Sequence, residues 1–323
     1  MGFIALIFAL MVEQGRPLPG DNYVHRWASA FADLVRGASD AGERQHGVFG
    51  WFFVVGCALA GVVVLEWLAT LLHPVALFVF HVLVLYLTVG FRQFSHAFTQ
   101  IQLALAADDA DDARRVLERW LRNSDPDEDA DRPRREAPVA EICRQAIAHA
   151  LVAAHRHVFG PLFWYILLPG AVGPVLYRFA ELLARRWGGT VAEGAARVAE
   201  PYGAFARRAY RAIDWLPARL SAAGFAIVGN FEDAVYCWRG AVAAGTAGDQ
   251  RALLLASGGG ALGLRIAEPA LEARWAAGEQ GFEWQGSEPD AAGLRSAVGL
   301  VWRSVILWIG LFAMLTVATW LGR

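Results

Sequence analysis

Long uncharged runs alternate with polar segments along this chain. Val48–Leu65 and Val75–Val89 are two such runs separated by a short turn, and they predict a helical hairpin in a membrane. Val305–Leu321 predicts a last span, whereas residues 2–12 are too few to cross a bilayer and predict a helix that spans only in part or packs on the others. The pattern predicts an all-α fold: a polytopic helical membrane bundle with about four or five membrane segments, one or two of which could be re-entrant.

The central run, Val158–Tyr177, has no charged residue but is interrupted by prolines and glycines. A lipid-exposed helix would leave backbone groups unpaired at such breaks, which are tolerated where neighbouring helices or water supply partners. The run therefore predicts either a broken membrane segment or a kinked packing helix. The interrupting residues are Gly160, Pro161, Pro169, Gly170, Gly173 and Pro174.

The polar segments predict how the chain is organised around these runs. We expect one membrane domain over residues 1–323, with a polar helical insertion at 92–157 and polar connecting segments at 181–212 and 265–298. Apolar residues recur at helical spacing in and just before the insertion and predict two amphipathic helices, and Val139–Val158 predicts a third that leads into the central run. The apolar positions of the first two are Phe91, Phe94, Phe98, Ile101 and Leu105, then Ala113, Val116, Leu117 and Trp120.

Arginines gather in residues 15–47, 92–157 and 181–212, and basic segments close to membrane spans favour the cytoplasm. A single crossing by the central run would place residues 181–212 on the outside, in conflict with that rule. A break at Pro169-Gly170 would resolve the conflict by forming two half-helices that enter and return on one side. We favour this re-entrant arrangement, with all three basic segments in the cytoplasm.

Residues 24–35 predict an amphipathic helix, which Asp21 could cap. Its apolar stripe is Val24, Trp27, Ala28, Phe31, Leu34 and Val35. Two placements remain open. The helix could lie on the membrane surface with its tryptophan at the boundary, or it could pack on the protein's own bundle.

Composition changes this picture in few places. The chain is 56% hydrophobic and 19% charged, whereas an ordinary soluble domain has roughly 25% charged residues. A net charge of −2 gives no reason to expect a nucleic-acid partner. The three cysteines, Cys57, Cys143 and Cys237, lack zinc or redox spacing, so we expect buried free thiols.

Two patterns resemble metal sites but each lacks a requirement. Asp125, Asp127 and Asp129 alternate as calcium ligands do, but the glycine and the terminal glutamate of an EF-hand loop are missing. The histidines His149, His155 and His157 do not share a helical face at the spacing of four residues. We therefore expect no metal site.

Leu253–Leu264 is rich in glycine. The backbone N–H groups of such a run can cradle a phosphate, but the lysine and serine of a Walker loop are absent. Close packing of helices through small residues is the alternative that we favour.

Polar groups inside apolar runs are candidates for a site, because charges at membrane depth are costly. His81 is either a buried functional group or, as we favour, part of an interhelical hydrogen bond. Asp214 and Arg219 flank Pro217, and a break at that proline could aim both side chains at one cavity. Arg219 would then offer a planar fork to a phosphate or carboxylate, and Asp214 could orient it or pair with Tyr177 or Arg178. The alternative is a structural ion pair that holds a re-entrant turn.

Four segments carry a resemblance to a known family: Gly160–Trp164, Tyr177-Arg178, Ile213–Leu220 and Gly260–Gly263, which read GPLFW, YR, IDWLPARL and GALG. Together with the order of the apolar runs, they resemble the CobD/CbiB superfamily of inner-membrane proteins. That superfamily includes cobinamide-phosphate synthases and AmpE proteins. The resemblance covers most of the chain and implies a multi-pass protein of a bacterial inner membrane.

One departure separates the chain from the synthases, which carry an A-E-N-x-x-D motif just before P-L-F. The corresponding residues here are Leu151, Val152, Ala153 and Arg156. The synthases join an amine to a carboxylate with ATP and Mg²⁺, chemistry that needs carboxylates to hold metal and phosphate. AmpE proteins also lack the motif and have an arginine before P-L-F-W, so the chain resembles that branch more.

The AmpE resemblance implies a non-catalytic sensor or regulator in cell-wall-fragment signalling and β-lactamase regulation. It would bind a small anionic ligand in an inherited cavity without a cofactor, and its partners would be membrane lipid and a cytoplasmic amidase. The alternative is a divergent cobalamin biosynthesis protein similar to adenosylcobinamide-phosphate synthases, which would use ATP and Mg²⁺ to form an amide. No catalytic residue is assigned, and the residues expected to bind the ligand are Arg156, Tyr177, Arg178, Asp214, Arg219, Gly260 and Gly263.

Overall fold

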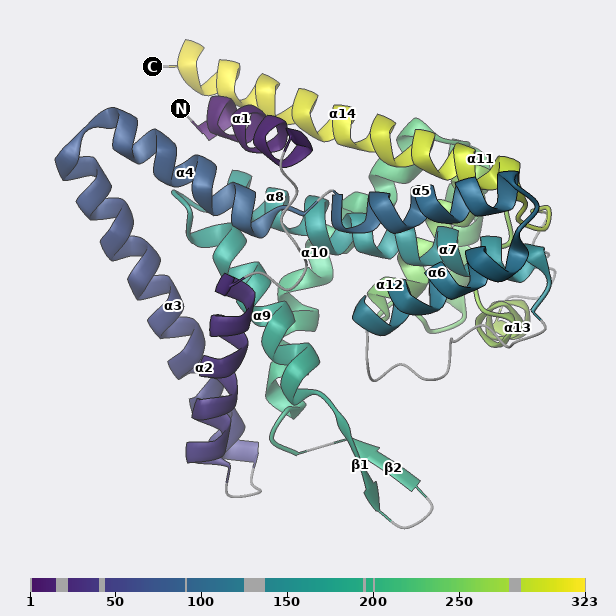
Figure 1. Cartoon of the computed structure of the whole chain (residues 1–323), viewed down its shortest axis with the longest axis horizontal. Coiled ribbons are helices and arrows are strands. Elements are labelled where there is room, and N and C mark those ends of the chain that lie inside the picture. The colour runs from purple at the N-terminus through teal and green to yellow at the C-terminus, as the bar shows by residue number, and fades with distance from the viewer. Residues whose placement is uncertain are drawn as a thin grey trace. The chain divides into compact units, whose positions relative to one another are not determined.

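The computed structural model divides into two compact units (Figure 1). Unit 1 comprises Met1–Gln93 and Gly160–Asp214, and unit 2 comprises Phe94–Phe159 and Trp215–Arg323. The structure describes residues 2–15, 23–40, 44–90, 92–124, 137–193, 196–199, 201–278 and 286–322. Asp21, Phe91 and the aspartates at 125, 127 and 129 lie outside these residues, and one membrane domain over the whole chain stays a prediction.

Unit 1 contains the predicted hairpin. Helix α3 (Arg44–Leu72) is followed by α4 (Pro74–Thr88), and the two meet at a sharp turn in Figure 1. His73 caps α4, since its Nδ1 accepts a hydrogen bond of 3.2 Å from the Val75 N–H, and Pro74 stands at the first helical position, where its missing N–H costs nothing. The helical hairpin is therefore confirmed, with a turn built by the two residues His73 and Pro74, and its place in a membrane stays a prediction.

The remaining elements of unit 1 pack around this hairpin. Helix α1 lies against α4, α2 against α3, and α9 against both α3 and α4. A core that contains Trp51, Trp187 and Tyr202 joins α2, α3 and α9. These elements are α1 (Gly2–Gly15), α2 (Tyr23–Ser39), α8 (Gly160–Leu167), α9 (Val172–Trp187), strands β1 (Thr190–Glu193) and β2 (Ala196–Ala199), and the first part of α10 (Ala204–Val228).

The central run is broken where the sequence predicted. Five residues in a π-helix, His155–Phe159, lead into the eight-residue α8, and a turn at Gly170 separates α8 from α9. Gly170 has φ of 69°, a left-handed conformation that glycine adopts without strain. The two halves then pack against each other. Two half-helices are thus confirmed, and their re-entry from one side of a membrane stays a prediction.

The regular elements among the described residues of unit 2 are helices, and one isolated β-bridge pairs Leu264 with Ser287. The predicted amphipathic helices are α5 and α6, and their apolar positions Phe98, Ile101, Leu117 and Trp120 are buried. Residues 142–154 of α7 are buried on every side. The elements are α5 (Arg92–Ala106), α6 (Ala110–Ser124), α7 (Val139–Ala154), the rest of α10, α11 (Phe231–Ala243), α12 (Gln250–Leu262), α13 (Pro269–Gly278) and α14 (Ala291–Leu321).

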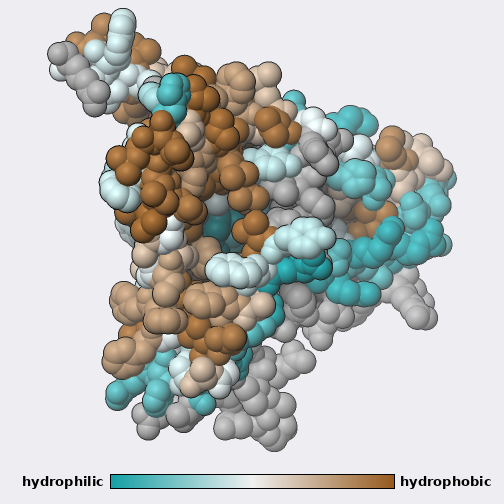
Figure 2. Space-filling view, turned by 60° about the vertical axis from the view of Figure 1, so that its left-hand side comes forward, coloured by the Kyte–Doolittle hydropathy of each residue, from teal (hydrophilic) through white to brown (hydrophobic). Residues whose placement is uncertain are grey.

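In the described part of the chain, two helices are long and apolar enough to cross a membrane: Gln45–Leu72, within α3, and α14. Only 22% and 17% of their most apolar windows are buried, unlike a helix in the core of a soluble protein. Figure 2 shows apolar side chains gathered on the face that carries α3 and α4. Helices α1 and α4 are apolar but shorter, so a total of four or five membrane segments stays a prediction.

Three expectations need correction. The fold class is all-α as predicted, but the described residues also contain one antiparallel hairpin, in which Thr190 pairs with Ala199. Cys143 and Cys237 are buried free thiols, whereas Cys57 is exposed because it lies on the apolar surface of α3. Helix α10 continues through Pro217, where a break was expected.

Candidate functional site

Two of the segments that carry the family resemblance meet in unit 1. The ring of Tyr177, on α9, is fully buried against Gly160, the first residue of α8. A Cβ atom at position 160 would collide with the ring and lie 2.5 Å from its hydroxyl oxygen. Gly160 is therefore required for the close approach of α8 and α9.

A third segment joins them through a buried carboxylate. The Tyr177 hydroxyl donates a hydrogen bond of 2.8 Å to Oδ1 of Asp214 on α10, and Asp214 is only 3% exposed. The Tyr210 hydroxyl lies 3.2 Å from that of Tyr177. Because Tyr177 has one hydroxyl proton and gives it to Asp214, Tyr210 must be the donor to Tyr177. We call Tyr177, Tyr210 and Asp214 the tyrosine–aspartate cluster.

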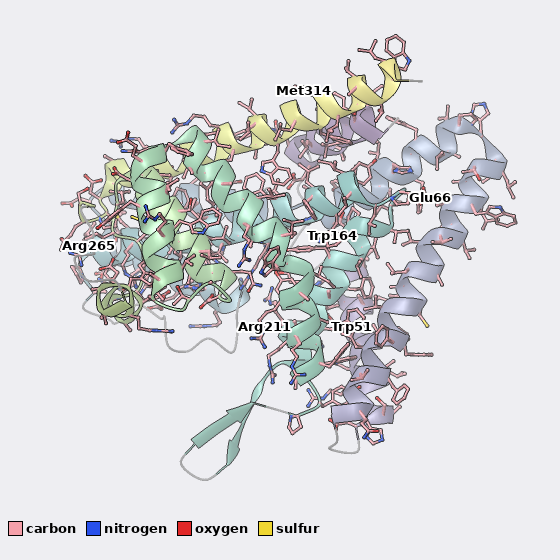
Figure 3. All side chains as sticks on the ribbon, turned by 180° about the vertical axis from the view of Figure 1, so that it is seen from behind. Trp51, Glu66, Trp164, Arg211, Arg265 and Met314 are labelled. Atoms are coloured by element: carbon pink, nitrogen blue, oxygen red, sulfur yellow. The ribbon has the colours of Figure 1, made fainter. Side chains whose placement is uncertain are left out.

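The continuity of α10 is explained by the tryptophan of the GPLFW segment. Proline has no N–H, so Pro217 cannot donate to the carbonyl of Ile213, four residues earlier. The indole Nε1 of Trp164, which is labelled in Figure 3, donates to that carbonyl at 3.3 Å instead. Trp164 replaces the missing helical donor, which is why the proline does not leave the half-buried Ile213 carbonyl unpaired.

Arg178 lies next to Tyr177 in sequence but has a different role. Its Nη1 is 2.6 Å from Oε2 of Glu181, one turn later on α9, and Glu181 is 3% exposed. Partial desolvation and then the charge of Arg178 lower the pKa of His25 on α2, whose side chain is exposed. Arg178 is thus paired with Glu181, and the predicted pairing of Asp214 is with Tyr177.

Arg219 lies in unit 2, and its partners differ from those of Asp214. Its guanidinium stacks on the Trp215 ring, 4.0 Å from the centroid. Nη1 donates to the Trp215 carbonyl at 3.0 Å and Nη2 to the Ala247 carbonyl at 2.8 Å. The expected break that would aim both side chains at one cavity is therefore wrong, because α10 is continuous. Arg219 is nevertheless held in one orientation, with N–H groups left for an anion.

Arg156 lies in the π-helix, and its side chain is half-buried. The preceding residue, His155, is buried and lies 2.9 Å through Nδ1 from the hydroxyl of Ser221 on α10. Residues 151–153 are buried apolar side chains, and Leu151 fills the space above Gly258 of α12. An ion such as Mg²⁺ has no oxygen ligand from these three side chains.

The two glycines predicted to bind a ligand have structural roles in unit 2. Gly260 packs against the backbone of α11, where its Cβ would meet the Asp233 carbonyl and lie 2.7 Å from the Ala234 Cα. Gly263 ends α12 with φ of 66°, and its N–H donates back to the Gly260 carbonyl. These contacts support helix packing, and a ligand role for either glycine stays a prediction.

The described residues contain no group of three or more His, Cys, Asp or Glu side chains that could hold a metal ion. Sequence reasoning missed Tyr210, Glu181 and Ser221. Tyr210 could have been found, because it lies four residues before Asp214 and so shares its helical face. Ser221 carried no signal, because its partner is 66 residues away.

Comparison with known proteins gives consistent results. The family model described as CobD/Cbib protein matches residues 5–301. The chain is 29% identical over 318 residues to the cobalamin biosynthesis protein CobD of Stutzerimonas stutzeri, which covers 95% of each chain. It is 31% identical over 264 residues to the protein of the same name from Chromobacterium violaceum, which covers 80% of this chain and 74% of the relative. No solved structure matches the chain.

These relatives overturn the preference for the AmpE branch. Both are named for cobalamin biosynthesis, and nothing links the chain to β-lactamase regulation or cell-wall-fragment signalling. The predicted AmpE-like sensor is therefore wrong, and the alternative in cobalamin biosynthesis is the better supported one. With a match over 5–301, the chain belongs to the CobD/Cbib protein family.

Proposed function

We propose that this protein acts in cobalamin biosynthesis, at the step that forms an amide between the amine of an aminopropanol phosphate and a corrinoid carboxylate. The observation that carries the proposal is the similarity to CobD of Stutzerimonas stutzeri along 95% of both chains. Proteins of this family are membrane proteins, and α3 and α14 have the length and hydropathy of membrane spans. We further propose a multi-pass location in the bacterial inner membrane, in contact with lipid.

An anionic substrate requires cations that are held in place. Arg219 meets this requirement, since stacking on Trp215 and two bonds to carbonyl oxygens restrict its guanidinium before any ligand binds. Such pre-orientation reduces the entropy lost on binding a phosphate. Arg156 supplies a second cation from the π-helix, a geometry that often occurs at functional sites.

Forming an amide from a free carboxylate requires activation, which ATP with Mg²⁺ supplies in the synthases that the chain resembles. The residues at 151–156 do not fit that ion, because Leu151, Val152 and Ala153 offer no oxygen ligand from their side chains and Arg156 would repel it. This mismatch favours a second candidate in the same pathway, an accessory protein that holds the phosphate-bearing substrate for a separate catalyst.

The test is complementation of a bacterial strain that lacks its own CobD, with growth made dependent on cobalamin synthesis. We expect the wild-type chain to restore growth, and Arg219→Ala to fail while it accumulates in the membrane at the wild-type level. Arg239→Ala is the matched control, an exposed arginine that should leave growth unchanged. Failure of the wild-type chain to restore growth despite normal accumulation would refute the proposal.

An assay of the purified protein separates the two candidates. ATP-dependent coupling of aminopropanol phosphate to a corrinoid acid identifies a synthase. Saturable binding of aminopropanol phosphate that Arg219→Ala abolishes, without coupling, identifies the accessory role. A protein that neither couples nor binds has no part in this step.

A further inference from the structure

Helix α2 packs on unit 1 through its small residues and leaves its large apolar side chains on the outside. Ala28, Ser29 and Ala32 are buried, and Ala32 belongs to the core that joins α2, α3 and α9. The side chain of Trp27 is 65% exposed and that of Leu34 is 69% exposed. A helix that met only water on its outer side would turn such side chains inward, so this arrangement points to an apolar partner.

These apolar residues lie along one flank of the helix. Trp27, Phe31, Leu34 and Ala38 follow one another at spacings of four, three and four residues, which places them on the same side. The rings of Trp27 and Phe31 stack, with their centroids 5.6 Å apart. We call these four residues the apolar flank of α2.

The apolar flank continues into the exposed side of α3. The ring centroid of Phe31 lies 6.3 Å from that of Phe53, which is itself exposed on α3. Phe49 and Phe52 are also exposed in this part of α3. Figure 1 shows α2 beside the first part of α3, and the two helices are in contact. Together they form one apolar surface.

Glu66, the one acidic residue of α3, bonds within unit 1. One carboxyl oxygen accepts a hydrogen bond of 3.1 Å from the N–H of Ala171, the cap residue of α9, and the other lies 3.3 Å from Nε2 of His81 on α4. Nδ1 of His81 lies 3.0 Å from the Tyr165 hydroxyl on α8, which confirms the interhelical hydrogen bond predicted for this histidine. The carboxyl group is therefore directed to neighbouring helices rather than to the exposed apolar side of α3.

Charged residues of α2 lie on a different flank. Asp33 directly precedes Leu34, and successive residues are about 100° apart around a helix axis. Asp33 accepts two hydrogen bonds from the guanidinium of Arg186 on α9. Arg26 lies about two turns before Asp33 and so shares its side of the helix. Helix α2 thus separates a charged flank, which Asp33 joins to α9, from the apolar flank beside α3.

We propose that the apolar flank of α2 contacts lipid, so that α2 and α3 present one surface to the bilayer. The inference rests on the membrane location proposed above for α3. Lipid is the occupant that fits, because the flank is continuous with a candidate span of which only 22% of the most apolar window is buried. A tryptophan on the apolar side of an amphipathic helix is typical of segments at a membrane boundary. Helix α2 then combines the two placements that the sequence left open: small residues pack on the protein's own bundle, and large ones meet lipid.

The test measures how often nitroxide spin labels on α2 collide with oxygen and with a water-soluble nickel chelate, in the full-length protein reconstituted into phospholipid liposomes. Apolar oxygen concentrates in lipid, whereas the polar chelate stays in water. Cys57→Ser removes the exposed native thiol, and Cys143 and Cys237 are buried. Single cysteines are then placed at three pairs of adjacent residues, of which the second lies on the apolar flank and the first does not: Arg26 and Trp27, Asp33 and Leu34, Gly37 and Ala38.

Adjacent residues differ by only about 1.5 Å along the helix axis, so a difference within a pair reports the side of the helix. We expect the ratio of oxygen to chelate collisions to be several-fold higher at Trp27→Cys, Leu34→Cys and Ala38→Cys than at their neighbours. The last pair perturbs the structure least, since a side chain at Gly37 meets no atom within 4 Å and Ala38 is exposed. It decides the matter should the larger replacements not fold.

Equal ratios within the pairs, or a higher ratio at the first residue of each pair, would overturn the proposal. Labels on the apolar flank that are shielded from both reagents would mean that protein, such as a second copy of the chain, covers the flank, and would also overturn it. Val64→Cys, at an exposed position of α3, tests the location on which the inference rests. Lipid at Val64 with water at the apolar flank refutes the inference alone, whereas water at Val64 refutes the membrane location and the inference together.

Discussion

At the scale of single residues, Trp164 and Pro217 are coupled although they lie in different segments. Pro217 removes the donor that would normally satisfy the Ile213 carbonyl, and the Trp164 indole supplies a replacement. The tryptophan of the GPLFW segment therefore supplies the donor that the proline of the IDWLPARL segment lacks. The IDWLPARL segment has a carbonyl acceptor without a helical donor, and the GPLFW segment has an indole donor that needs an acceptor.

A double-mutant cycle tests this coupling. Trp164→Phe keeps the aromatic volume but leaves the Ile213 carbonyl without its donor, and we expect a loss of about 1–3 kcal/mol in unfolding free energy. In a Pro217→Ala background the alanine N–H can bond to that carbonyl, so the same change should cost less, with a coupling of roughly 0.5–3 kcal/mol. Thermal or denaturant unfolding in detergent measures the cost of Trp164→Phe in the wild-type and in the Pro217→Ala background. Equal costs in the two backgrounds would show that the tryptophan acts only through its packing.

At the scale of elements, the glycines of α12 set how closely it packs on α11. The backbone of Asp233 and Ala234 occupies the space that a side chain at Gly260 would need. Gly258 is similarly filled by Leu151, whose Cδ1 lies 2.5 Å from an ideal Cβ position. Packing on α11 thus accounts for Gly260 of the GALG segment, and a ligand role for this segment stays a prediction.

Gly260→Ala should force α11 and α12 apart and cost about 1–3 kcal/mol of stability. Gly310→Ala in α14 is the matched control, since that helical glycine has no atom within 4 Å of its Cβ position. There the substitution should be neutral or slightly stabilising, because alanine favours helix. Melting temperatures of the two variants give the comparison. An unchanged melting temperature for Gly260→Ala would contradict the packing role.

At the scale of the whole molecule, the break between α8 and α9 bears on membrane topology. The arginines of 92–157 and 181–212 favour the cytoplasm for both segments, and the two half-helices that pack together allow it. Asn123→Cys and Arg208→Cys place thiols at exposed positions in these segments. In intact cells, with Cys57 replaced by serine, we expect both to resist impermeant thiol reagents and to react after lysis. Labelling of Arg208→Cys alone would mean that the chain crosses the membrane between the two sites.

Local features of the fold followed from the sequence. The α3–α4 hairpin, the apolar stripes of α5 and α6 and the break near Gly170 depend on neighbours in the chain and on the partition of side chains between apolar and polar surroundings. The spacing of apolar residues and the positions of glycine and proline in the sequence show both of these directly. Part of the candidate site was also accessible, since Tyr177 was proposed as a partner of Asp214. The continuity of α10 at Pro217 could not be predicted from the sequence. It depends on Trp164, which lies 53 positions earlier in the chain.

By itself, the sequence determined the helical class, the positions of the apolar runs and membership of the superfamily. These follow from patterns within a few residues of one another and from short motifs. Only the tertiary structure decided that Asp214 bonds to Tyr177 while Arg219 bonds to carbonyls, and that Glu66, His81 and Tyr165 meet at one turn. Hydrogen bonds need donor and acceptor within about 3 Å, and for residues on different helices that distance is set by packing rather than by local pattern.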